Sequence, residues 1–395
     1  MRRTLPSITT SCLGVLTALW AASCSKRDAA PEPVSAPGLA QATGPLDIPM
    51  MAPRLVATLE QTHFRFQYAP ETDAGLGYEV LVPKDWKFTK PSSVAAPAGG
   101  PLDTVALGDF TGPPALGSPA IIMSTTMPRF EIPLDTMLRE SFSRSGYTIV
   151  AGHWIPGVHG LYFEATGTRI RDGAQQVRRT SARADGGHIF LVTCLVPRAH
   201  WDEVKDTCWV AHDGFTVQKA TGESQLEPWL TARGRRPNFR VAYPASWSAT
   251  PVEPAPEGVA AVDLRLTNPA KDRLLAYCQI KVQRLEKGEA VPPLDRLAGR
   301  AVEKLAALRF STSGAPVPLT GDDDPRAAAV AGWLGGFVVN GHLASSDATA
   351  RLGFAQRNGF LTTWLLLGPT AHDDLVVALR AQRAFEMARA TAEAN

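Results

Sequence analysis

Three histidines could form a metal-binding site if the fold brings their side chains together. His153 and His159 flank a Pro-Gly turn, and His188 opens a later strand-like segment. Three imidazoles are a suitable ligand set for a transition metal. The alternative is that all three are surface or strand-end residues. The sequence favours this alternative, so we expect no metal and no cofactor.

A His-x-Asp pattern occurs twice, at His200–Asp202 and at His372–Asp374. Each occurrence falls where a helix is expected to begin, and the macrodipole favours carboxylates in the first turn of a helix. Thr370 and Asp373 also resemble a capping box. We therefore interpret the repeated pattern as a helix start rather than as a catalytic pair.

Motifs of common catalytic and nucleotide-binding sites are absent from the sequence. It contains no G-x-S-x-G, no H-E-x-x-H, no P-loop and no G-x-G-x-x-G at a strand–helix junction. The acidic run Asp322–Asp324 lacks the alternating spacing of a calcium loop. We expect a protein that is not an enzyme. The alternative is a hydrolase or metal-dependent enzyme whose site lies between the two domains described below.

Arginines gather around a predicted hairpin that turns at Arg171–Gly173. Side chains alternate along a strand, so Arg179 and Arg183 share one face and Arg178 points to the other. A basic face here could meet anionic lipid headgroups or an acidic partner, or it could simply be solvated. Arg169 adds a further positive charge on the first strand.

The cysteines divide into three groups. Cys12 and Cys24 belong to the N-terminal leader, and Cys278 lies alone in an apolar strand, where we expect it to pack as a small hydrophobe. Cys194 ends a strand and Cys208 lies in the helix that folds back from it. An exported protein can oxidise such a pair, so a disulfide is possible there.

The N-terminus resembles the leader of a bacterial lipoprotein. Arg2 and Arg3 precede a mostly apolar stretch, Leu5–Ala22, which runs into the small residues of Ala21–Cys24. A cysteine at that place resembles the lipobox, where lipoproteins are cut and acylated, for example with palmitate. The alternative is an ordinary secretory signal in which Cys24 is incidental. In such lipoproteins, an Asp directly after the acylated cysteine favours retention in the inner membrane. Ser25 stands at that position here, so we expect the protein at the outer membrane, facing the periplasm.

Internal repetition is the strongest pattern in the chain. Its landmarks recur in the same order at nearly constant spacing, with extra residues in the second copy around Pro316–Ala329. The matched segments are Tyr78–Trp86 with Phe239–Trp247, Pro133–Asp135 with Pro293–Asp295, and Gly187–Asp202 with Gly359–Asp374. Arg179 matches Arg351, and Leu366 takes the place of Cys194.

Each copy predicts the same order of strands and helices, which indicates an α+β fold with an antiparallel sheet. We expect Asp135 and Asp295 to be helix N-caps, and Trp86 and Trp247 to be core anchors. The expected helices are 135–145, 199–208, 295–308 and 371–387. The expected strands include 104–111, 120–126, 162–169, 176–183, 188–196, 259–267 and 274–283.

This order resembles the PsbP/DcrB-like family of small α+β sandwich domains. The resemblance rests on the opening aromatic-x-Val-x-x-Pro-x-x-Trp, on the Pro-Leu-Asp helix start, and on the apolar strand before the last helix. It implies two tandem antiparallel-sheet sandwich domains with helices packed on the sheet, which act by binding, and it carries over no catalytic residue. The expected parts are a leader and lipobox (1–24), a Pro/Ala-rich tether (25–57), a first domain (58–217), a linker (218–237) and a second domain (238–395).

The formal charge of +2 argues against a nucleic-acid binder. We therefore expect a membrane-tethered, non-catalytic adaptor or chaperone-like protein. Its partners would be the membrane, reached through the lipid anchor, and a protein that the sequence does not identify. A structural subunit of an envelope or secretion assembly is a further alternative. The two copies either pack through equivalent faces into one shared groove or are independent.

Overall fold

The computed structural model describes residues 46–48, 61–70, 73–91, 102, 104–157, 160–319 and 330–394. Residues 41–395 form one compact unit. The predicted lipidation site Cys24, most of the predicted tether, His159 and the run Asp322–Asp324 lie outside the described residues. No helix in the described ranges has the length and hydropathy to cross a membrane.

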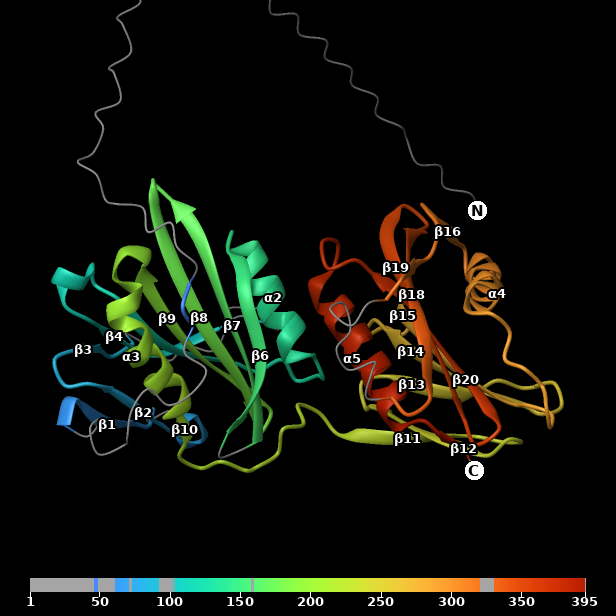
Figure 1. The fold of residues 1–395 in the computed structure, drawn as a ribbon. Coiled ribbons are helices and arrows are strands. Elements are labelled where there is room, and N and C mark those ends of the chain that lie inside the picture. Colours follow the sequence, from blue (N-terminus) through green and yellow to red (C-terminus); the bar gives the residue numbers. More distant parts are fainter. Residues whose placement is uncertain are drawn as a thin grey trace, which may run out of the picture. The chain divides into compact units, whose positions relative to one another are not determined.

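The first repeat contains a three-stranded sheet, β1-β2-β10, and a seven-stranded sheet, β3-β4-β5-β9-β8-β7-β6. Figure 1 shows these strands with two helices, α2 and α3. The bounds are β1 (His63–Tyr68), β2 (Tyr78–Pro83), β3 (Lys87–Thr89), β4 (Val105–Thr111), β5 (Ala120–Thr126), α2 (Leu134–Arg144), β6 (Thr148–Gly157), β7 (Gly160–Arg171), β8 (Ala174–Asp185), β9 (His188–Pro197), α3 (Trp201–Asp213) and β10 (Thr216–Val217).

The second repeat has the same plan, with a three-stranded sheet β11-β12-β21 and an eight-stranded sheet that runs β13-β14-β15-β20-β19-β18-β16, with β17 paired to β18. Its bounds are β11 (Trp229–Gly234), β12 (Phe239–Pro244), β13 (Ser248–Pro251), β14 (Val259–Thr267), β15 (Leu274–Arg284), α4 (Leu294–Ala307), β16 (Phe310–Thr312), β17 (Val317–Pro318), β18 (Trp333–Leu343), β19 (Ser346–Arg357), β20 (Phe360–Pro369), α5 (Leu375–Thr391) and β21 (Glu393–Ala394).

The register of the central strands agrees with the repeat. Arg179 pairs with Cys194 on the neighbouring strand, and Arg351 pairs with Leu366 at the corresponding place. All strand pairs among the described residues are antiparallel. The predicted sheet-rich α+β class is therefore confirmed.

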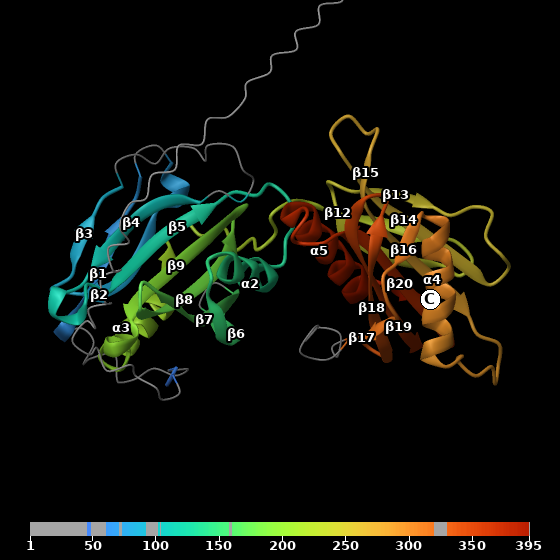
Figure 2. The same ribbon diagram turned by 90° about the horizontal axis from the view of Figure 1, so that it is seen from above.

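Each large sheet buries both of its faces, because its strands carry apolar residues on each side. In the first repeat, α2 packs on one face through Met137, Leu138 and Phe142. The other face carries α3 and β2, in a core that includes Trp86. In the second repeat the two faces are covered by α4 and α5, and Trp247 lies in the α5 core. Figure 2 shows the helices from above. Both predicted tryptophan anchors are buried, as expected.

The helix starts differ from the sequence predictions in detail. Asp135 and Asp295 are not N-caps, because α2 and α4 begin one residue earlier, after Pro133 and Pro293. Both carboxylates lie in the first turn, where the macrodipole still favours them. Thr370 does not begin α5, because Asp374 is the N-cap and accepts a hydrogen bond from the Val377 amide. The Thr370 hydroxyl still accepts a hydrogen bond from the Asp373 amide at 3.3 Å, in the turn before the helix.

Parts of the predicted linker and of the predicted tether, which show no periodic pattern in the sequence, also contact the folded repeats. The predicted linker contains β11, which pairs along β12. Part of the predicted tether contacts the first repeat, since Leu46 packs on its core and the Asp47 carbonyl accepts a hydrogen bond from the Trp201 indole at 2.7 Å. Hydrophobic periodicity does not predict these contacts, because the segments are short and polar.

Contacts within the compact unit also join the two repeats, but not through equivalent faces. Glu131, just before α2, accepts a hydrogen bond from Trp229 at 3.0 Å and forms an ion pair with Arg383 of α5 at 3.0 Å. Thr136 of α2 accepts a hydrogen bond from Gln382 of α5. Because the counterpart of α2 is α4, these contacts do not join equivalent faces, as the shared-groove alternative requires.

Candidate functional site

Three ionisable side chains of the first repeat meet inside the protein. Glu164 on β7 lies 2.6 Å from Arg179 on β8, measured from Oε1 to Nη2, and 3.5 Å from His212 Nδ1 on α3. Their side chains are 3%, 0% and 1% exposed. Glu164 and Arg179 can meet because they are diagonal neighbours on one face: Glu164 is opposite Ser181, and Thr166 is opposite Arg179. We call Glu164, Arg179 and His212 the buried polar cluster.

The buried polar cluster keeps His212 neutral. Burial is the main cause that lowers the pKa of this imidazole well below its usual range, and the nearby Arg179 and Arg183 charges lower it further. Glu164 does not reverse this effect, because its charge is already compensated by the closer Arg179 guanidinium. Arg183 donates hydrogen bonds to the carbonyls of His212 and Phe215, so the end of α3 is attached to β8.

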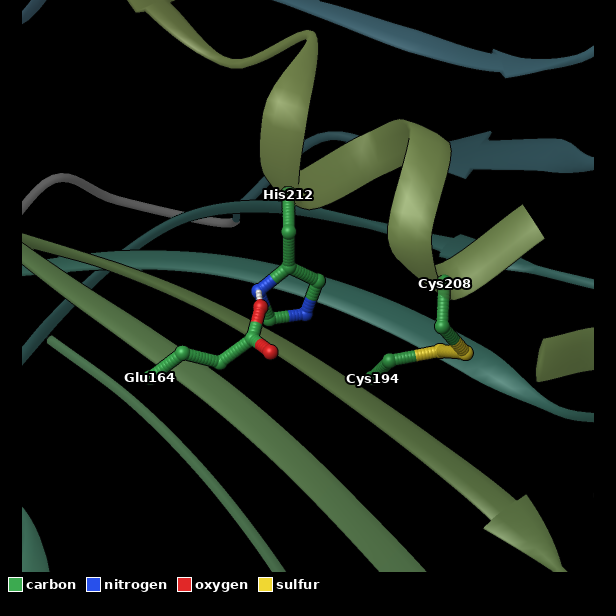
Figure 3. Close-up of a disulfide and its surroundings, with 4 residues drawn as sticks. All are labelled: Glu164, Cys194, Cys208 and His212. Carbon is green, nitrogen blue, oxygen red and sulfur yellow. Dashed lines mark ion pairs between the residues drawn. A yellow bond between two sulfur atoms is a disulfide. The ribbon is translucent and has the colours of Figure 1, made fainter. Parts of the chain in front are cut away.

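A disulfide lies beside the buried polar cluster. Cys194 on β9 and Cys208 on α3 are bonded, with their Cα atoms 5.7 Å apart. Figure 3 shows His212 and Cys208 one helical turn apart on α3, above Glu164 and Cys194 of the sheet. The covalent bond and the hydrogen bonds from Arg183 to the His212 and Phe215 carbonyls thus attach the same helix to the same sheet.

The unfolding free energy is expected to fall as the pH decreases below about 6.5, the unfolded pKa of histidine. Folded His212 stays neutral in that range while the unfolded chain takes up a proton, so stability is present above pH 6.5 and lost below it. One such group contributes a slope of up to about 1.4 kcal/mol per pH unit. Urea denaturation between pH 7 and pH 5 measures the slope.

His212→Gln should reduce that slope, and the difference from the unmodified protein is the readout because other groups also titrate. His342→Gln is the matched control, since the His342 side chain is half exposed. Equal slopes for the unmodified protein and His212→Gln would contradict the assignment.

The three histidines considered as metal ligands can be followed only in part, because His159 lies outside the described residues. His153 lies on β6 and His188 opens β9. Among the described residues no group of three possible ligands could hold a metal. His200 instead contacts Glu203 within its own helix start, at 3.0 Å. Cys278 is buried with the thiol reduced, as its apolar strand indicated, and burial raises the pKa of this thiol.

The arginines around the hairpin are divided as alternation predicts, but the face of Arg179 and Arg183 is not a basic surface. Both point toward α3, where Arg179 is fully buried. Arg178 lies on the other face, with its guanidinium over the Phe142 ring of α2. The exposed positive charge is therefore carried by other residues of the hairpin.

The second repeat does not contain the buried polar cluster. By strand register, Gly336 takes the place of Glu164, and Leu366 that of Cys194. Of these residues, only Arg179 has an identical counterpart in the second repeat, which is Arg351. A cavity of about 160 Å³ lies at this face of α5, lined by Arg351, Leu366 and Ala381, with Thr349, Gln382 and Glu140 among its polar residues. It is a candidate ligand site that sequence patterns did not reveal, because its lining comes from distant segments.

Comparisons with known proteins give fold likenesses only. No protein-family model and no curated protein matches the chain. The solved structures it is similar to include PsbP (CyanoP) from Synechocystis sp. PCC 6803, at 16% identity and a TM-score of 0.27 over 39% of this chain and 92% of that one. LpqN of Mycobacterium tuberculosis, involved in cell envelope biogenesis, has 15% identity and a TM-score of 0.28 over 41% of this chain and 96% of that one.

A longer match is to immunity protein TplEi of the type VI secretion system of Pseudomonas aeruginosa, solved with a peptide. It covers 82% of this chain and 98% of that one, at 10% identity and a TM-score of 0.20. All three TM-scores are far below 0.5, so these likenesses assign neither a family nor a function to the chain.

Proposed function

We propose that this chain is an exported lipoprotein, acylated at Cys24 and held at the outer membrane facing the periplasm, that acts by binding a protein partner. The observation that carries the proposal is a disulfide downstream of a leader that ends in Ala21–Cys24. Disulfides persist in oxidising compartments, and a cysteine directly after small residues is the pattern of an acylated N-terminus. The resemblance of the sequence to the PsbP/DcrB-like family supports binding as the mode of action.

The interior of the first repeat is consistent with a binding scaffold. Its ionisable cluster is shielded from solvent, which gives a substrate no access to Glu164 or His212. The disulfide and the hydrogen bonds from Arg183 to the His212 and Phe215 carbonyls instead hold α3 against the sheet. A rigid scaffold of this kind costs less ordering entropy when its surface binds a partner.

Cys24→Ser is expected to leave the protein either soluble in the periplasm or unprocessed in the inner membrane, because no thiol remains to accept the lipid. Separation of the two membranes followed by immunodetection measures this. Cys12→Ser is the matched control: it changes a leader cysteine that the mature protein lacks, and should not alter fractionation. Processed Cys24→Ser protein in the outer membrane would contradict the lipoprotein assignment.

A further inference from the structure

The connected ends of β7 and β8 carry exposed positive charge next to an exposed apolar side chain. Figure 1 shows these two green strands projecting past their neighbours. Ile170 is 75% exposed and the Arg171 side chain is 71% exposed. Asp172 and Gly173 have positive φ angles, as a tight two-residue turn requires, so the end of the hairpin is well defined. We call Arg169, Ile170 and Arg171 the hairpin tip.

Arg169 of the hairpin tip and the neighbouring Arg178 are held by aromatic rings and neutral acceptors. The Arg169 guanidinium lies 4.6 Å from the centre of the Tyr147 ring and donates hydrogen bonds to the Gln176 side chain. Arg178 lies 4.4 Å from the centre of the Phe142 ring and donates to Thr180, Ser141 and Ser145 hydroxyls.

No described carboxylate is paired with either of these two arginines, and Arg171 contacts only the adjacent, exposed Asp172, at 3.4 Å. The local positive charge is therefore uncompensated by any well-formed ion pair within the described chain. Such a patch attracts anions from solution.

The fold itself does not need these arginines. The same strand register in the second repeat places Gly341 at the position of Arg169, Leu343 at that of Arg171 and Ala350 at that of Arg178. The second hairpin forms without a single arginine at these places. Arg169 and Arg178 have structural contacts with Tyr147 and with the end of α2, whereas the charge of Arg171 is left without a structural role beyond its contact with Asp172.

We propose that the hairpin tip docks on an anionic phospholipid surface. The end of the hairpin would enter the surface edge-on, so that Ile170 reaches the boundary between headgroups and acyl chains from one face of β7, while Arg169 and Arg171, on the opposite face, contact the phosphates. Apolar side chains flanked by basic residues bind membranes in this way. Each arginine near an anionic surface contributes about 1 kcal/mol. An acidic protein would match the charge but would leave Ile170 without an apolar contact, so the lipid surface is the better fit.

Vesicle binding by the chain from Ser25 onward tests the proposal independently of lipidation, because this chain keeps every described residue and carries no anchor. Ala174→Cys provides a labelling site for an environment-sensitive fluorophore at the exposed hairpin turn. Cys194 and Cys208 are bonded and Cys278 is buried, so the new thiol reacts selectively. Ser346→Cys is the matched control, since Ser346 is exposed at the corresponding place in the second repeat.

On vesicles of phosphatidylglycerol and phosphatidylethanolamine in equal parts, the label at 174 should show a blue shift that the label at 346 does not. No shift is expected on phosphatidylcholine alone. Arg171→Gln should lower the partition coefficient about fivefold, and Arg169→Gln combined with Arg171→Gln about 25-fold, the factors that correspond to about 1 kcal/mol per arginine. Ile170→Ser should weaken binding while keeping its dependence on salt.

Two results would overturn the proposal. One is an unchanged partition coefficient in Arg171→Gln and Ile170→Ser, which alter only exposed side chains and should fold normally. The other is tight binding of the tip to soluble polyglutamate with no shift on anionic vesicles, which would assign the tip to an acidic protein partner instead.

Discussion

Glu164→Ala is expected to lower the free energy of unfolding by about 3–5 kcal/mol, because it leaves the Arg179 charge buried without its carboxylate. Urea denaturation followed by far-UV circular dichroism measures the change. Glu393→Ala is the matched control: it also removes a carboxylate 2.6 Å from an arginine, but Arg240 and Glu393 are both exposed, with side chains 64% and 51% accessible. Exposed pairs contribute about 0–1 kcal/mol.

Removing both charges should cost far less than removing one. Glu164→Leu combined with Arg179→Met replaces the ion pair by apolar side chains of similar length, which is often neutral or stabilising. A Glu164→Ala variant within about 1 kcal/mol of the unmodified protein would show that water or another group compensates Arg179. The account of a cluster sealed from solvent would then be wrong.

Loss of the disulfide is the second large expected effect. Cys194→Ala combined with Cys208→Ala should lower the free energy of unfolding by about 3 kcal/mol, the value for a closed loop of about 15 residues. The bonded cysteines are 14 residues apart in sequence, so the crosslink restricts the unfolded chain to a comparable extent. Urea denaturation of the oxidised protein and of the variant gives the difference.

Cys278→Ala is the control, since it also removes a buried sulfur but breaks no crosslink. Its cost should be about 1 kcal/mol, the usual effect of a small core deletion. Mass mapping of a non-reduced digest checks the bond directly. If both Cys194 and Cys208 are recovered as alkylated free thiols from exported protein, the predicted crosslink is absent.

Sequence patterns predicted the repeating framework because each copy carries the same local landmarks. Strands such as β5 and β14 have the predicted bounds, since runs of apolar residues define them without help from the rest of the chain. Element ends were less predictable. Asp135 is a good N-cap residue, yet α2 begins at Leu134 because Pro133 already has the extended backbone that precedes a helix.

The candidate sites depended on contacts that local patterns do not contain. Glu164 is a charged residue within an apolar strand and His212 lies on the apolar face of α3, and these two anomalies were the available signal. No local sequence pattern indicates that Glu164 and His212 lie close to each other and to Arg179. Alternation did predict that Arg178 and Arg179 point to opposite faces, but not which face is buried.

The two repeats have the same framework but different interiors. The first keeps a polar cluster and a crosslink between α3 and its sheet, whereas the second replaces Glu164 and Cys194 by Gly336 and Leu366. Since the framework forms both ways, neither the cluster nor the crosslink is a requirement of the fold. Exposed charge at the end of the β7–β8 hairpin belongs to the first repeat, whereas the cavity is lined by both repeats, with Thr136 and Glu140 of α2 facing residues of β19, β20 and α5.

Crosslinking in intact cells tests most directly whether this chain is a tethered binding protein. Cells that express the unmodified protein are treated with a membrane-permeant amine-reactive crosslinker, and the protein is detected by immunoblot beside the Cys24→Ser variant. A discrete larger adduct is expected for the unmodified protein, and it should be lost or strongly reduced in Cys24→Ser. A single unshifted band, or the same adducts with and without Cys24, would show that the chain is not a tethered binding protein.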